Sequence, residues 1–251
     1  MEQYFSSMKF EGFGNETALY RNIAQVILLS LIDIIKRTGI SYNLQETLNR
    51  ISSLNIVKRD GETHEYVDGT NTLYLSTTNG YSISYSDEDI IIFLTHELMH
   101  FGCANDNEFY KEYFGFDEFF TEYLTFVVVS KCGGINMESY YKRNVQGYFD
   151  ESDNNLMKNL IDKYGYSELL DIYMNRNKEK ARKIIGQSTL QSFNEYHNYY
   201  DELTDLIGRP LRECRKIIQN SIMKPQKDKL CEYVNLINQS ISFNEPLGKT
   251  I

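Results

Sequence analysis

The stretch Thr95-His96-Glu97-Leu98-Met99-His100 determines how the rest of this chain is interpreted. On an α-helix, two histidines four positions apart lie about 40° apart around the axis and about 6 Å apart along it. The imidazoles of His96 and His100 can therefore both reach one metal ion, and Glu97 can lie beside it as a general base. The H-E-x-x-H pattern also occurs by coincidence, so the surrounding sequence has to support a zinc site.

The composition favours a folded protein that does not bind nucleic acid. Of the 251 residues, 41% are hydrophobic and 14% are aromatic, which is enough for a substantial core. The net charge of −9 argues against a nucleic-acid partner, because phosphate binding requires a basic surface.

The same sequence predicts a cytoplasmic protein with no membrane span. Residues 1–5 lack the basic and then apolar pattern of a signal peptide. The most apolar run, residues 23–35, contains Gln25 and Asp33 and is too short and too polar to cross a bilayer. The four cysteines form no C-x-x-C pair, which favours reduced thiols. A secreted protein already trimmed of its signal would look the same, so secretion stays open.

We expect an α+β fold that divides near residue 102. Within residues 1–102, apolar periodicity predicts a long helix over 15–38, and turn residues separate short strands of a small mixed or antiparallel sheet that precedes the zinc helix. Residues 103–251 are predicted to be all helical, with helices that include 107–114, 116–131 and 167–185. These two regions are expected to form one compact catalytic unit.

A catalytic zinc ion usually has three protein ligands, and the first candidates for the third lie in Asp117-Glu118-Phe119-Phe120-Thr121-Glu122. The glutamates at 118 and 122 share one face of a strongly apolar helix. Carboxylates on such a helix are costly unless a positive group neutralises them, and a zinc ion with its histidines would do so. The ordinary alternative is an amphipathic helix whose acids face water.

A second candidate for the third ligand is Asp106, six residues after His100. This is where the metzincin pattern places its third ligand, but that pattern needs a glycine three residues after the second histidine for a sharp turn. Cys103 occupies that position, and the glycine comes one place early, at Gly102. Asp106 is better explained as the cap of a helix that begins near residue 107.

Taken together, His96-Glu97-Leu98-Met99-His100 and Asp117-Glu118-Phe119-Phe120-Thr121-Glu122 resemble the two motifs of the gluzincin metallopeptidases, which include thermolysin-like proteases and the aminopeptidase N group. The resemblance covers residues 71–130 and implies a zincin-like fold. By position it makes Glu118 the third zinc ligand. It makes Glu122 the acid that accepts a hydrogen bond from the first histidine and orients that ring.

The second motif departs from the family pattern at two positions. Asp117 replaces the usual asparagine, and Phe119 replaces a small residue. These departures leave open whether Glu118 or Glu122 is the direct ligand, and the motif match favours Glu118.

The resemblance predicts a zinc-dependent metallopeptidase that acts on a peptide or protein substrate. Zinc bound by two imidazoles and a carboxylate lowers the pKa of its water toward ~7, and Glu97 would take a proton from that water as it attacks. An endopeptidase is favoured over an aminopeptidase, because the G-x-M-E-N signature is absent before the zinc motifs. The alternative is a zincin-like binding or sensing protein with structural zinc and little or no turnover.

Such a peptidase also needs a hydrogen-bond donor that stabilises the oxyanion of the reacting carbonyl. The family takes this donor from the helical C-terminal half, which makes His197 the first candidate, with Tyr140 and Tyr141 as others. In a chain with 20 tyrosines, packing alone also explains a tyrosine-rich helix around His197. His64 lies in a polar stretch and is expected to be exposed.

The substrate of such an enzyme pairs as a strand with the sheet edge beside the zinc helix. Residues 79–85 directly precede that helix and are predicted to be this edge strand. Tyr81 and Tyr85 could then line the cleft, although strand packing explains both equally well.

Overall fold

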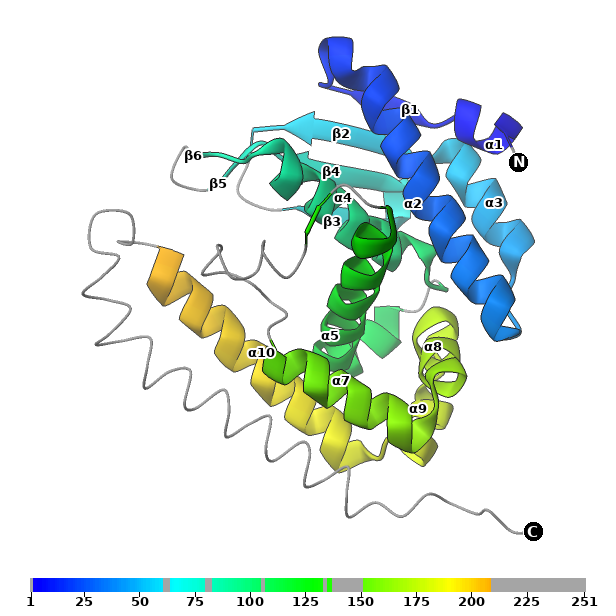
Figure 1. Ribbon diagram of the computed structural model, residues 1–251, viewed down its shortest axis with the longest axis vertical. Coiled ribbons are helices and arrows are strands. Elements are labelled where there is room, and N and C mark those ends of the chain that lie inside the picture. The colour runs from blue at the N-terminus through cyan, green and yellow to red at the C-terminus, as the bar shows by residue number, and fades with distance from the viewer. Residues whose placement is uncertain are drawn as a thin grey trace. The chain divides into compact units, whose positions relative to one another are not determined.

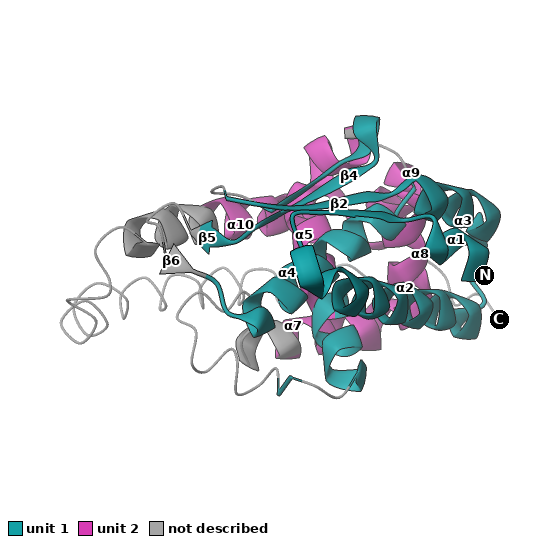
Figure 2. Ribbon diagram, turned by 90° about the horizontal axis from the view of Figure 1, so that it is seen from above, with its two compact units in different colours: residues 1–105, 124–137 teal, residues 106–123, 138–251 magenta. Residues whose placement is uncertain are grey.

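The computed structural model describes residues 2–60, 64–79, 83–104, 107–132, 135–136 and 151–208. This region of the chain is mostly helical with a small mixed sheet, so the predicted α+β class is confirmed (Figure 1). The chain divides into two compact units, residues 1–105 with 124–137 and residues 106–123 with 138–251 (Figure 2). Helix α5, Asn107–Cys132, contributes to both units. The expected division at residue 102 stays a prediction.

The first unit begins with three helices whose ends follow from local sequence signals. The long helix predicted over 15–38 is present, and it ends at Gly39, whose φ of 67° lies in the left-handed region that glycine adopts without strain. The next helix is capped by Asn43, whose side chain accepts a hydrogen bond from the Glu46 N–H at 3.2 Å. The three helices are α1 (Glu2–Ser6), α2 (Thr17–Thr38, after the 3-10 turn Gly14–Glu16) and α3 (Leu44–Ser53).

Within the described residues, 14–38 form the one helix that is long and apolar enough to cross a membrane. Core helices pass the same test of length and composition, and Leu28 and Leu31 on this helix are fully buried. The expected absence of a membrane span stays a prediction.

The sheet of the first unit has four strands in the order β1-β2-β4-β3. Strand β2 pairs in parallel with β1 and β4, whereas β3 pairs antiparallel with β4. Leu73 and Leu75 are fully buried on one face of β4. On its other face Thr72 and Ser76 are buried and Tyr74 is partly buried, so both faces of this strand are largely covered. The strands are β1 (Lys9–Glu11), β2 (Asn55–Arg59), β3 (Glu65–Val67) and β4 (Thr72–Ser76).

The prediction that residues 79–85 form the edge strand of this sheet is wrong. Strands β5 (Thr78–Asn79) and β6 (Ile83–Ser84) pair with each other as a separate antiparallel ribbon. Only three residues separate the two strands in the sequence, so each short strand has its pairing partner close by along the chain. In the described residues, the edges of the four-stranded sheet are β1 and β3.

The second unit contains helices α7 (Glu151–Tyr164), α8 (Tyr166–Asn175), α9 (Lys178–Ile184) and α10 (Gln187–Gly208). The single helix predicted over 167–185 is wrong, because the chain breaks between α8 and α9. Arg176 has a left-handed φ of 52°, and the side chain of Asn177 caps α9 by accepting the Lys180 N–H at 2.9 Å.

Helix α5 has a kink at Tyr113, whose φ and ψ are −129° and 33°, which agrees with the helix break predicted at residue 115. The side chain of Asn194 pairs with both backbone groups at the kink: it accepts the Gly115 N–H at 2.9 Å and donates to the Glu112 carbonyl at 2.8 Å. Position 115 requires glycine, since a Cβ atom there would lie 2.2 Å from the Phe193 carbonyl oxygen. The kink sets the direction of the segment that carries Glu118.

Candidate metal centre

The two motif histidines lie on α4, Asp87–Gly102, and local hydrogen bonds determine where this helix begins. A capping box closes that end: the Ser86 hydroxyl accepts the Asp89 N–H at 3.2 Å, and the Asp89 carboxylate accepts the Ser86 N–H at 2.8 Å. Leu94 and Leu98 are fully buried on the apolar side of the helix, where α4 contacts α2, β3 and β4. These contacts set the rotation of α4 about its axis, and hence the direction of its histidines.

The C-terminal end of α4 is also held from outside the helix. The Tyr42 hydroxyl donates a hydrogen bond to the Gly102 carbonyl, and the Arg50 guanidinium donates one to the Cys103 carbonyl at 2.9 Å. Cys103 itself is extended, with a ψ of 158°. His100 is therefore two residues from a helix end whose carbonyls are satisfied. Asp106, the alternative third ligand, lies outside the described residues.

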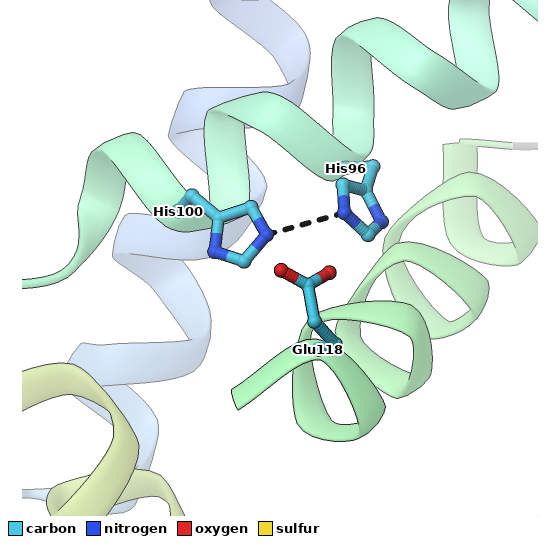
Figure 3. A group of neighbouring side chains, drawn as sticks. All are labelled: His96, His100 and Glu118. Carbon is cyan, nitrogen blue, oxygen red and sulfur yellow. Dashed lines mark hydrogen bonds between the residues drawn. The ribbon is translucent and has the colours of Figure 1, made fainter. Parts of the chain in front are cut away.

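The structure brings His96, His100 and Glu118 together (Figure 3). The two Nε2 atoms are 3.1 Å apart, and the ligand atoms of the three residues all lie within 4.8 Å of one another. Each of the three side chains is partly buried. A tetrahedral zinc ion with bonds of about 2.0–2.1 Å would hold two nitrogens about 3.4 Å apart, so the histidine pair fits such an ion. Two imidazoles and one carboxylate are also the donor set of many catalytic zinc sites.

The carboxylate of Glu118 has a partner that the sequence interpretation missed. The hydroxyl of Tyr110, from the first segment of α5, donates to Oε1 of Glu118 at 2.8 Å. A hydrogen bond to a ligating carboxylate fixes its orientation toward a metal. Tyr110 lies eight residues before Glu118 with the kink between them, so helical periodicity alone could not identify this pair.

Three other acids of the two motifs are buried. Glu97 is 8% exposed on α4, and Glu122 is 7% exposed one turn after Glu118 on α5. Among the described acids, Glu118 is the one that groups with both imidazoles, and the role of Glu122 as partner of His96 stays a prediction. Asp117 is fully buried and forms an ion pair with Arg176, which gives a structural reason for an acid at this position.

His64 is not exposed, contrary to the sequence-based expectation. Its ring stacks on Phe93 of α4 with centroids 3.8 Å apart and lies 5.3 Å from the ring of Tyr85. Its Nδ1 accepts the backbone N–H of Ser76 at 3.1 Å. Burial, with a contribution from nearby His96, lowers the pKa of His64 from 6.5 to about 4. Nothing in the local sequence signalled this, because the contacts come from β4 and α4.

His197 and Tyr85 are the other predicted site residues that the structure describes. His197 lies on α10, partly buried, with its ring edge-on to Phe114 at 5.6 Å. Tyr85 is partly buried and packs edge-on against Phe93 at 4.9 Å. The predicted roles of both stay predictions. Tyr81, Tyr140 and Tyr141 lie outside the described residues.

No protein-family model matches this chain, and searches of curated proteins and of solved structures found no match. The resemblance to the gluzincins therefore rests on the motif residues alone, and it stays a prediction.

Proposed function

We propose that this chain is a zinc-dependent metallopeptidase with a zincin-like fold, in which His96, His100 and Glu118 hold the metal. The observation that carries the proposal is the grouping of their ligand atoms within 4.8 Å of one another. Each of these residue types is a normal zinc ligand, and three protein ligands leave a position for the reaction.

Glu97 is the reason for proposing catalysis instead of a structural ion. A zinc ion in this donor set would act as a Lewis acid and lower the pKa of bound water toward ~7. Glu97 follows His96 directly on α4, and as the general base it would take a proton from that water and pass it to the leaving amine. Tyr110, through its hydrogen bond to Glu118, keeps that carboxylate in one orientation.

The proposal is tested with zinc content and peptide cleavage measured on the same samples. We expect wild-type protein to bind about one zinc ion and to cleave casein or a peptide library. Glu97→Gln should keep the metal and lose cleavage by about 10²–10⁴-fold, because the base is gone while the ligands remain. Glu88→Gln is the matched control: it changes an exposed acid in the first turn of the same helix, and it should keep both properties.

The outcomes separate the proposed function from its alternative. Zinc binding without cleavage of any peptide would instead indicate a zincin-like binding or sensing protein. A chain that binds no zinc would contradict both. Internal fragments among the products would identify an endopeptidase, whereas single residues released from the N-terminus would identify an aminopeptidase.

A further inference from the structure

The hydrogen bond between Ser76 and His64 determines which nitrogen of the His64 ring carries a proton. The backbone N–H of Ser76 donates into Nδ1 at 3.1 Å, so Nδ1 must present a lone pair. An imidazolium has no lone pair to offer, so the ring is neutral and its single proton lies on Nε2. Ser76 is fully buried at the end of β4, which makes this donor a rigid one.

The protonated nitrogen of His64 is a buried donor for which the described part of the chain offers no acceptor. Nε2 is inaccessible to solvent and has no hydrogen-bond partner among the described residues. An unsatisfied buried donor costs about 1–3 kcal/mol, and native proteins rarely keep one that serves no purpose. The ring is held on its other nitrogen and on its face, so it cannot turn away to satisfy this donor.

The stacking partner of His64 lies on the same face of α4 as the candidate metal ligands. Phe93 precedes His96 by three residues, Glu97 by four and His100 by seven, and these spacings define one side of an α-helix. The ring of His64 therefore covers this face about one turn before His96. A substrate bound to the zinc motif of α4 would lie beside it.

We propose that His64 is a catalytic residue of the peptidase proposed above, on which this inference rests. Its Nε2–H donates a hydrogen bond to the carbonyl oxygen of the scissile peptide as that oxygen gains negative charge. The proton stays on Nε2 throughout, and His64 forms no covalent bond. Because Nε2 is covered in the free chain, the substrate must displace the groups that cover it. The ring itself is already oriented by Ser76 and Phe93, so it does not have to turn to stabilise the oxyanion. The role suggested for His197 thus falls to a histidine of the first unit.

The test compares three variants of the full, zinc-loaded chain. His64→Phe keeps a ring that can stack on Phe93 but has no nitrogen; we expect kcat to fall about 10²–10³-fold with KM within a few-fold. His64→Gln offers an amide oxygen to Ser76 and an N–H to the substrate, so it should regain at least about tenfold over His64→Phe. His197→Phe should lower kcat less than His64→Phe does. Zinc content and Tm show whether each variant is folded and loaded.

A second readout does not depend on cleavage. The ¹⁵N NMR spectrum of the zinc-loaded chain should show His64 protonated at Nε2 and unprotonated at Nδ1 at pH 7. The opposite tautomer, an unchanged kcat in folded His64→Phe, or a larger loss in His197→Phe would each overturn the role of His64 while leaving the peptidase intact. A wild-type chain that cleaves nothing would overturn both proposals.

Discussion

Asp117 and Glu118 are neighbours on α5, yet the two faces of this helix stabilise a carboxylate in different ways. Asp117 is fully buried against Arg176, whose guanidinium also lies over the ring of Tyr173 at 5.5 Å. Glu118 is partly buried, accepts the Tyr110 hydroxyl and groups with two imidazoles. The first face supplies its own cation. The second supplies ligands, and we propose that its cation is a metal ion. One face should therefore govern stability and the other zinc binding.

The largest effect is expected from Glu118→Gln, which removes the charge and keeps the shape of the side chain. Losing a group that merely supports a ligand costs about 10–100-fold in metal affinity, so loss of the ligand itself should cost more than about 100-fold. Cleavage should fall at least as far. The free energy of unfolding of the metal-free chain should change by less than about 0.5 kcal/mol, because Glu118 is not fully buried. Zinc titration and thermal unfolding measure the two quantities.

Glu122→Gln is the matched control for this assignment. It makes the same chemical change one turn further along α5, at the other acid of the motif. If Glu118 is the ligand, Glu122→Gln should weaken zinc binding less than Glu118→Gln does. The reverse order would make Glu122 the direct ligand.

A second prediction concerns the Asp117 face. Arg176→Met should lower the free energy of unfolding by about 3–5 kcal/mol, because it leaves the charge of Asp117 buried without its cation. The left-handed backbone at residue 176 contributes little to the difference, since arginine and methionine carry the same strain there. Denaturant unfolding measures the loss.

The double variant Asp117→Asn with Arg176→Met shows where that loss comes from. It removes both charges, so it should recover most of the stability lost in the single variant. Zinc affinity of the folded single variant should stay close to that of the wild type. Weaker zinc binding with unchanged stability would contradict the division between the two faces.

The sequence predicted those elements of the fold that depend on local signals. The apolar periodicity of residues 15–38 predicted α2, which ends at Gly39. The break at Arg176 was missed, because a left-handed arginine has no local signature and its partner Asp117 is 59 residues away. Residues 79–85 were assigned to the main sheet because alternation predicts a strand but does not identify the strand that pairs with it.

The candidate site also combines residues that the sequence predicted with residues that only the folded structure reveals. The spacing within α4 predicted that His96 and His100 would be adjacent, and the second motif nominated Glu118. His64 and Tyr110 could not be found from the sequence. One depends on a backbone N–H of β4, and the other depends on the direction that α5 takes after its kink. Such contacts exist only once the chain is folded.

A smaller effect is expected from Tyr110→Phe, which tests the Glu118 face without removing a ligand. Loss of the hydroxyl leaves the Glu118 carboxylate less well oriented, so zinc affinity should fall about 10–100-fold. Stability should hardly change, because Tyr110 is exposed. Competition against a chromogenic chelator measures the affinity. Unchanged binding would mean that the hydrogen bond does not orient a ligand.

The smallest effect is expected at Glu112, an acid on α5 whose cations are partly exposed. Hydrogen bonds from Arg182 at 2.6 Å, then from Lys178 and Tyr113, lower the pKa of Glu112 from 4.5 to about 2. A carboxyl group whose pKa is lower in the folded than in the unfolded state stabilises the protein above pH 4.5 and loses this contribution as the pH falls toward 2. Glu112→Gln should therefore cost less than about 1 kcal/mol at pH 7, and the difference from wild type should shrink below pH 4.5.

Exposure explains why this ion pair should matter so much less than the one at Asp117. The side chains of Arg182 and Glu112 are 48% and 29% exposed, against 6% and 0% for Arg176 and Asp117. Water and salt screen the first pair, so 1 M NaCl should reduce the effect of Glu112→Gln and leave that of Arg176→Met nearly unchanged. A difference between wild type and Glu112→Gln that grew on acidification would show that the protonated carboxyl makes the better contacts. In that case, burial would not explain why the Asp117–Arg176 pair should contribute more stability than the Glu112–Arg182 pair.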